Sequence, residues 1–263
     1  MGNIQQFLVC RIGLYDKDLQ RLSHHLYSPL DYVGAIADIS EFILTRMNQG
    51  NKINAKYAGE LSYYFKSKEI RRVIICHNQQ KMVSYHFPFQ TIQIGNSFLL
   101  TLNGVDINLE KLAKIKEILE YLRNRPKERW GSQFPPSLID AYKDLSDDEY
   151  DEIPDDIFSL FYHISSTEPG YLRYDYDPTG QNGKIHPLHH FDINYNCHST
   201  YKYGLYDLMK KNSFENIFIR SKEKLYLHSY SNFLSVNNQR KESKKNIHSR
   251  KFRKKLKTFR SYK

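Results

Sequence analysis

The chain has 263 residues, of which 40% are hydrophobic and 26% are charged, and these globular proportions exclude a chain that is disordered throughout. No segment approaches the roughly 20 apolar residues of a membrane span, and the three cysteines are too scattered for a disulfide framework or a zinc motif. The sequence predicts a soluble cytoplasmic protein without a membrane partner, and its net charge of +10 comes from residues 239–263, outside which acidic and basic residues nearly balance.

The first half of the chain predicts helices followed by an antiparallel sheet. Apolar residues recur at helical spacing over 14–48, with a break at Pro29, and a short helix is expected over 55–65. The period then changes to that of β-strands, and the strand-like runs are 72–76, 81–87, 91–94 and 98–102. Asn103-Gly104 is a turn signal, and a longer helix with an apolar stripe is expected between it and Pro126.

Composition divides the chain into four parts. Residues 1–125 form a helical and antiparallel-sheet region, 126–156 a proline-rich acidic connector, 157–238 a hairpin and helix rich in His and Asp, and 239–263 a basic tail. We expect the first and third parts to pack as one compact body. The predicted fold class is α+β, with N-terminal helices, a central antiparallel sheet, and a C-terminal β-hairpin followed by a helix.

A polar face is predicted on the C-terminal hairpin. Residues 171–177 alternate between apolar and charged side chains, and a second alternating run follows over 185–194 after a turn at 178–183. If the two strands pair antiparallel, Arg173, Asp175 and Asp177 share a face with His190 and Asp192. His186, four residues before His190, returns to the same face, and the next strand-like run adds Lys202. The catalytic candidates on this face are His186, His190, Asp175, Asp192, Arg173 and Lys202.

Three interpretations of this face are open. The two histidines can act as acid and base, oriented by Asp175 and Asp192, while Arg173 and Lys202 bind phosphate, which describes a ribonuclease without a cofactor. The same histidines and aspartates also suit a divalent ion such as Zn, Mn or Fe, which describes a metal-dependent phosphodiesterase. In the third interpretation the charges form cross-strand ion pairs and have no chemical role.

The other histidines are assigned no chemistry. His189 faces the apolar side of a regular strand, so it is expected to be a packed residue. His24 and His25 are expected at the surface or in packing contacts of the first helical region. His86 and His198 have no carboxylate beside them in the sequence, and we assign them no role.

The basic tail is the clearest sign of a partner. Its positive charges are interrupted by apolar and aromatic side chains, a pattern that suits phosphate neutralisation and stacking on bases. The predicted nucleic-acid-binding residues are Arg250, Lys251, Arg253, Lys254, Lys255, Lys257 and Arg260. A partner protein, or the acidic connector of the same chain, is the alternative ligand.

Part of the hairpin resembles a known family. The run Arg173-Tyr-Asp-Tyr-Asp177, followed by His186-Pro-Leu-His-His190, resembles a family of bacterial domains of unknown function. That family carries an Arg-aromatic-Asp-aromatic-Asp strand and then His-Pro-x-Ser-His, so Arg173, Asp175, His186, Pro187 and His190 occupy motif positions. His189 stands where the family has Ser, and its next motif, Asn-Cys-Arg, is met by Asn-Cys-His at 196–198.

The resemblance covers about residues 171–220 and implies a functional site, but it assigns no activity. The order of motifs is also loosely similar to TumE-type toxins of bacterial toxin–antitoxin modules. We therefore expect a nucleic-acid-directed protein that prefers RNA, a ribonuclease of toxin or phage-defence type with an antitoxin or defence-complex partner. The first alternative is a non-enzymatic module that binds nucleic acid or protein, and the second is the metal-dependent phosphodiesterase.

Overall fold

A computed structural model describes residues 9–23, 25–47, 57–64, 71–78, 80–94, 97–124, 134–145, 153–182, 185–193 and 201–219. All of them belong to one compact unit, Met1–Lys222, and the remainder of the chain forms a separate unit. The basic tail and its predicted nucleic-acid-binding residues lie outside the described residues, and so do residues 196–198 of the family motif.

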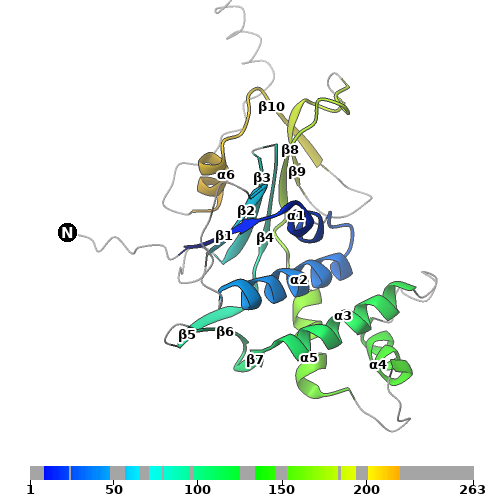
Figure 1. Ribbon diagram of the computed structural model, residues 1–263. Coiled ribbons are helices and arrows are strands. Elements are labelled where there is room, and N and C mark those ends of the chain that lie inside the picture. Colours follow the sequence, from blue (N-terminus) through cyan, green and yellow to red (C-terminus); the bar gives the residue numbers. More distant parts are fainter. Residues whose placement is uncertain are drawn as a thin grey trace, which may run out of the picture. The chain divides into compact units, whose positions relative to one another are not determined.

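The main feature is a seven-stranded antiparallel sheet (Figure 1). In spatial order its strands are β1 (Val9–Leu14), β2 (Gly59–Tyr64), β3 (Arg72–His77), β4 (Lys81–His86), β8 (Leu172–Tyr176), β9 (His189–Ile193) and β10 (Tyr201–Leu205). Each strand is antiparallel to its neighbours. The predicted α+β class with a central antiparallel sheet is confirmed.

A second, three-stranded sheet follows β4 in the chain. Its strands are β5 (Gln90–Ile94), β6 (Ser97–Leu102) and β7 (Val105–Ile107). The turn between β6 and β7 contains the predicted Asn-Gly pair, with φ of 50° at Asn103 and 85° at Gly104. Two consecutive residues with positive φ give the tight hairpin turn whose twist matches antiparallel strands, and Asn and Gly adopt that conformation most readily.

Six helices accompany the strands in the described part of the chain: α1 (Asp16–Leu22), α2 (Pro29–Met47), α3 (Leu109–Asn124), α4 (Phe134–Leu145), α5 (Asp155–Ser166) and α6 (Lys211–Phe218). Pro29, where the sequence pattern predicted a break, is the first residue of α2. At this position its missing N–H costs no hydrogen bond. Helix α2 lies against α3, α5 and β6, and Ile36, Ile39 and Ile43 are fully buried there. None of these helices is both long and apolar enough to cross a membrane.

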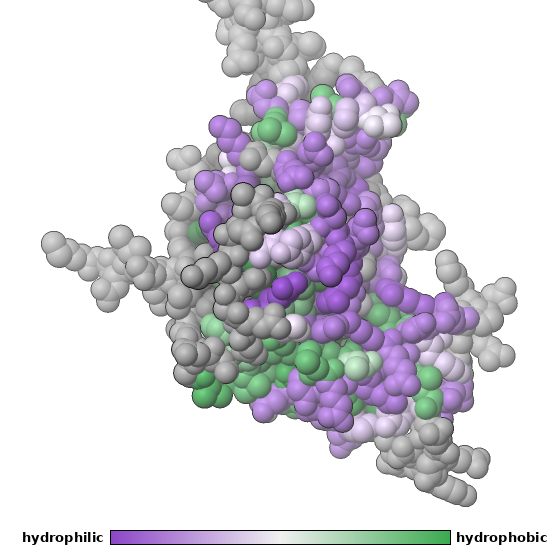
Figure 2. Space-filling view, in the orientation of Figure 1, coloured by the Kyte–Doolittle hydropathy of each residue, from purple (hydrophilic) through white to green (hydrophobic). Residues whose placement is uncertain are grey.

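The two faces of the large sheet contact different cores. Leu61, Val73 and Val83 point toward α2 and belong to the larger core, whereas Ile74 and Met82 point the other way and pack with Phe214 of α6. Hydrophilic side chains gather over α1 and the adjoining part of the sheet (Figure 2). The strand pairing puts Arg173 beside Val83, on the face of the larger core.

Two segments differ from the sequence-based expectation. The helix predicted over 55–65 is wrong, because residues 59–64 form the inner strand β2. Leu61 and Tyr64 belong to opposite cores, so β2 is covered on both faces and lacks the alternation that identifies a strand exposed on one side. Within the predicted connector, α4 buries Leu138, Ala141 and Tyr142 in the larger core, close to α3.

Candidate functional site

The predicted hairpin pairs as expected and places the polar residues on neighbouring strands. Arg173 lies opposite Asp192, and Asp175 lies opposite His190. Strand β10 adds Lys202 on the other side of Asp192. All five side chains therefore share the face that carries the larger core, beyond the part of the sheet that α2 covers (Figure 1). We call these five residues the candidate site.

Arg173 is the hub of the candidate site. Its Nε donates to Asp175 Oδ2 at 2.6 Å, and its Nη2 donates to Asp192 Oδ2. The guanidinium is largely buried, with 11% of the side chain exposed, and burial opposes its charge. The interactions with the Tyr171 hydroxyl and with the charged carboxylates of Asp175 and Asp192 outweigh that effect, and the pKa of Arg173 lies above its ordinary value. Arg173 is thus a fixed positive charge held between two carboxylates.

Lys202 links His190 to the same network. Its Nζ donates to Asp192 Oδ1 at 2.7 Å and lies 3.2 Å from His190 Nε2. The other ring nitrogen, Nδ1, donates to the carbonyl oxygen of Pro187 at 2.8 Å, so the lone pair of the neutral ring is on Nε2. Burial is the main cause that lowers the pKa of His190, and the carbonyl of Pro187 opposes it. His190 is therefore a neutral imidazole whose basic nitrogen faces Lys202.

Asp192 is the most enclosed carboxylate of the candidate site, with 3% of its side chain exposed. Burial acts to raise its pKa. The hydrogen bond from Lys202 and the charge of Arg173 outweigh burial, so the pKa of Asp192 lies below its ordinary value. Asp192 consequently stays ionised between its two cationic neighbours.

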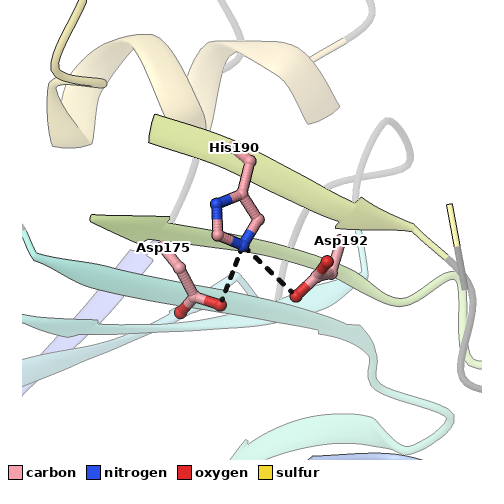
Figure 3. A group of neighbouring side chains, drawn as sticks. All are labelled: Asp175, His190 and Asp192. Carbon is pink, nitrogen blue, oxygen red and sulfur yellow. Dashed lines mark ion pairs between the residues drawn. The ribbon is translucent and has the colours of Figure 1, made fainter. Parts of the chain in front are cut away.

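Asp175, His190 and Asp192 also form a potential metal-binding group (Figure 3). His190 Nε2 lies 3.8 Å from Oδ2 of each aspartate, and one ligand atom from each residue falls within 4.8 Å of the others. Two carboxylates and an imidazole suit Zn, Mn or Fe. However, the same two Oδ2 atoms accept hydrogen bonds from Arg173, and Lys202 lies against Nε2. A divalent ion would have to displace at least one of these cations.

His186 and Asp177 form the rim of the candidate site. His186 Nε2 lies 3.2 Å from Asp177 Oδ2, and the His186 ring stands almost perpendicular to that of His190, with centroids 4.7 Å apart. Asp177 also accepts a hydrogen bond from Gly180 N, which is the main cause that lowers the pKa of Asp177. About a third of each side chain is exposed, although His186 Nε2 itself is buried, and His190 is less exposed than either residue.

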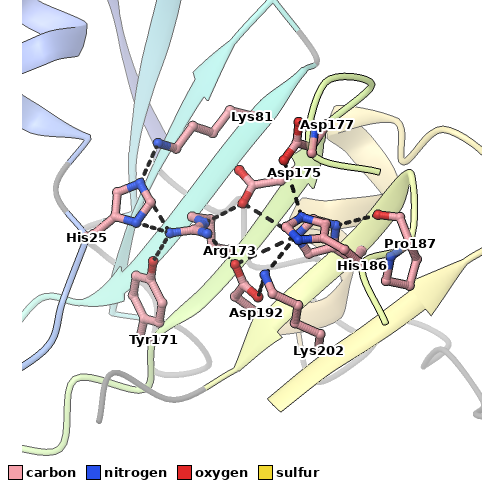
Figure 4. A network of polar contacts seen from close by, with 12 residues as sticks. His25, Lys81, Tyr171, Arg173, Asp175, Asp177, His186, Pro187, Asp192 and Lys202 are labelled. Carbon is pink, nitrogen blue, oxygen red and sulfur yellow. Dashed lines mark hydrogen bonds and ion pairs between the residues drawn. The ribbon is translucent and has the colours of Figure 1, made fainter. Parts of the chain in front are cut away.

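The structure adds contacts that the sequence did not indicate (Figure 4). His25, on the connection between α1 and α2, contacts Arg173 Nη1, and its Nε2 lies 3.0 Å from Lys81 Nζ. Burial, followed by the charges of Arg173 and Lys81, lowers the pKa of His25 to about 4. Tyr171 accepts a hydrogen bond from Arg173 Nη1 at 3.3 Å. His25 was expected only as a surface or packing residue.

His189 lies on the opposite face from the candidate site, as predicted. Its Nδ1 is 2.9 Å from the hydroxyl of Tyr174, and its ring stacks on Tyr176 with centroids 5.1 Å apart. The structure thus brings together all six predicted candidates, counting His186 at the rim, and excludes the histidine that was expected to be packed.

Comparison of the chain with protein-family models, with curated proteins and with solved structures found no match. The resemblance over residues 171–220 therefore stays a prediction.

Proposed function

We propose that this protein is a nucleic-acid-directed ribonuclease that cleaves its substrate with side chains alone. The observation that carries the proposal is the position of Lys202, whose ammonium contacts both the basic nitrogen of His190 and the buried carboxylate of Asp192. An imidazole beside a cation that can bind phosphate is the minimal apparatus for moving a proton at a phosphodiester.

The reaction follows from these positions. A substrate phosphate draws the Lys202 ammonium toward itself and so uncovers His190 Nε2. That nitrogen takes the proton of the ribose 2′-hydroxyl, whose oxygen forms a new bond to phosphorus. The bond from phosphorus to the 5′-oxygen breaks, and His186 delivers a proton to the leaving oxygen, giving a 2′,3′-cyclic phosphate and a 5′-hydroxyl end. The fixed charge of Arg173 and the displaced ammonium of Lys202 stabilise the additional negative charge on the phosphate.

The substrate preference is part of the proposal. The attacking group is the 2′-hydroxyl, which DNA lacks, so the mechanism is restricted to RNA. A metal-dependent phosphodiesterase is the second candidate, because Asp175, His190 and Asp192 converge closely enough to hold an ion. The two candidates differ in one simple respect: chelation of divalent ions leaves the first active and inactivates the second.

The test is an RNA cleavage assay in the presence of a chelator. His190→Ala is expected to lower the rate by about 10²–10⁴-fold, the usual contribution of a general acid or base. His189→Ala is the matched control, since it removes a histidine of the same strand from the opposite face. Cleavage that requires added metal would favour the second candidate. An intact wild-type chain that cleaves neither RNA nor DNA under either condition contradicts both.

A binding module without catalytic activity is the remaining alternative, with the basic tail as its contact to nucleic acid. In that case deletion of residues 239–263 removes a steep salt dependence of RNA binding. Replacement of His186 or His190 then leaves RNA binding unchanged.

If the ribonuclease is of toxin or defence type, a partner protein that covers Lys202 and His186 inhibits it. This can be tested by adding candidate antitoxins to the cleavage assay.

A further inference from the structure

A second polar cavity lies at the other end of β4, away from the candidate site. It has a volume of about 260 Å³, and its polar lining comes from Arg71, His86, Gln90, Asn103, His163 and Thr167. Strand β4 runs from Lys81, beside the candidate site, to His86 in the cavity. Five residue steps along a strand put these two ends roughly 17 Å apart. The two sites therefore have separate residues.

The lining is basic and contains no carboxylate. Arg71 directly precedes β3, His86 is the last residue of β4, and His163 belongs to α5. The amide and hydroxyl side chains add further hydrogen-bond donors. Among the described residues, neither Arg71 nor the adjacent Arg72 forms an ion pair with a carboxylate. Arg72 instead donates to Ser84 Oγ at 2.8 Å and lies over the ring of Phe218. Neither arginine is thus neutralised by an ion pair within the described part of the chain, although the carboxylate of Glu168 follows directly after the lining residue Thr167.

The pKa of His86 reflects burial and the positive charge around the cavity. Burial is the main cause that lowers the pKa of His86 to about 4, and the positive charges of Arg71, Arg72 and His163 lower it further. The C-terminal end of α5, whose carbonyl groups would repel an anion, is partly covered, because Thr167 Oγ1 donates to the carbonyl oxygen of His163 at 2.7 Å. The cavity is an electropositive site with donors directed from several elements.

We propose that this cavity binds a phosphate group, either as free inorganic phosphate or as the terminal phosphate of a mononucleotide. Arginine, imidazole and amide donors are the groups that bind phosphate oxygens in proteins. The volume is slightly below the range of about 300–1,000 Å³ that is usual for small-molecule sites. A phosphate with at most its sugar fits such a volume, whereas a polynucleotide strand does not. The site is independent of the proposed ribonuclease activity.

Calorimetric titration with inorganic phosphate, and separately with a nucleoside 5′-monophosphate, tests the proposal on the full chain. Arg71→Gln and His163→Gln are each expected to weaken binding by about tenfold, because each removes a charged or charge-assisted hydrogen bond. Lys17→Gln, which removes one exposed positive charge from α1, is the matched control and should leave binding unchanged. Tighter binding of the nucleotide identifies it as the source of the phosphate, and equal binding identifies the free ion.

Nuclear magnetic resonance of the histidine rings gives a second readout. Bound phosphate should raise the pKa of His86, which the surrounding Arg71, Arg72 and His163 now depress. The proposal is overturned if millimolar phosphate and nucleotide show no saturable binding. It is equally overturned if binding survives Arg71→Gln and His163→Gln but is lost in Lys202→Gln, because the anion then occupies the candidate site. Phosphate binding that persists in the His190→Ala variant supports it and separates it from the ribonuclease proposal.

Discussion

Two partly buried charge networks lie on opposite faces of the large sheet, and they differ in what they connect. The α6 network consists of Arg11, Glu60, Ser62, Lys211 and Glu215. In it Ser62 Oγ donates to Glu215 Oε1 at 3.1 Å, Arg11 lies 3.5 Å from Glu215, and Lys211 binds Glu60. These contacts join α6 to β1 and β2, three elements from distant parts of the sequence.

The candidate site connects strands that backbone hydrogen bonds already join. Arg173, Asp192 and Lys202 lie side by side on β8, β9 and β10, so their ion pairs add little to the arrangement of the chain. Burying such charges has a desolvation cost, which in the α6 network accompanies the docking of a helix onto two strands. In the candidate site, the contact from outside the strands is that of His25 with Arg173. The candidate site also contains an imidazole whose basic nitrogen faces a cation, and the α6 network has none. The comparison teaches that the two buried networks differ in the groups they bring together, and this difference is what the proposed function rests on.

The largest effect is expected from Asp192→Ala. Removing this buried carboxylate leaves Arg173 and Lys202 short of a partner, and breaking a buried ion pair costs about 3–5 kcal/mol in unfolding free energy. Urea denaturation measures the loss. Asp177→Ala is the control, because Asp177 is more exposed and its contact with His186 contributes about 0–1 kcal/mol. Equal losses in the two variants would contradict the assignment of Asp192 to a buried network.

Glu215→Ala should lower the stability of the protein without changing RNA cleavage. Glu215 is buried, but its partners Arg11 and Lys211 are partly exposed, so we expect a loss of about 1–3 kcal/mol from its hydrogen bond and ion pairs. The rate of RNA cleavage per folded molecule should stay unchanged. A large fall in cleavage at full folding would place the α6 network in the functional apparatus and remove the distinction between the two faces.

Gly204→Ala should disturb the candidate site with a small change in stability. A Cβ at this position, directly opposite His190 on β10, would lie 2.9 Å from Pro187 Cγ, so Pro187 must move together with the carbonyl that holds His190. We expect cleavage to fall by about tenfold or more, because displacements near 1 Å have such effects. In Gly104→Ala, far from the site, the added methyl group meets no atom within 4 Å, but alanine is strained at a φ of 85°. This control should therefore lose some stability while cleavage per folded molecule stays unchanged.

The smallest effect is the contribution of the histidines at the candidate site to the pH dependence of stability. His86, outside the candidate site, contributes in the same direction, because its pKa is also lowered to about 4. The pKa of His25 is about 4 in the folded chain against 6.5 for an ordinary histidine, and that of His190 is also lowered. Protonation therefore favours the unfolded chain, and stability should decline as the pH falls from about 6.5 toward 4. His25→Gln should reduce this decline by about 1 kcal/mol or less. The residue as a whole is exposed, although its ring is partly buried beside Arg173 and Lys81, so solvent screens much of the interaction. An unchanged decline in this variant would contradict the contact with Arg173.

The sequence predicted the hairpin because one of its faces is polar. In residues 171–177 the charged and aromatic side chains alternate, and this alternation predicted that Arg173 shares a face with Asp192. The register that places the two residues directly opposite each other came from the structure. Strand β2 could not be found in this way, since both of its faces are buried. The helical contacts of α4 were also missed, because prolines and acidic residues around it resemble a solvated connector.

His25 shows what sequence patterns leave out. Its contact with Arg173 joins residues 148 positions apart, and no local periodicity links the two. The α6 network is equally long-range, since Ser62 and Glu215 are 153 positions apart. Residues of one hairpin could therefore be grouped from the sequence, whereas contacts supplied by loops and distant helices required the fold.

The order of the strands has a consequence for synthesis on the ribosome. Strand β8 pairs with β4, although the three-stranded sheet and helices α3–α5 are made between them. A nascent chain of about 170 residues already has four strands of the large sheet, the three strands of the small sheet and five helices. Strand β4 is then an open edge, and none of the five side chains from Arg173 to Lys202 has been made. The candidate site is therefore assembled only after its last strands emerge, and an activity that depends on it, such as the proposed RNA cleavage, would be absent from the growing polypeptide until then.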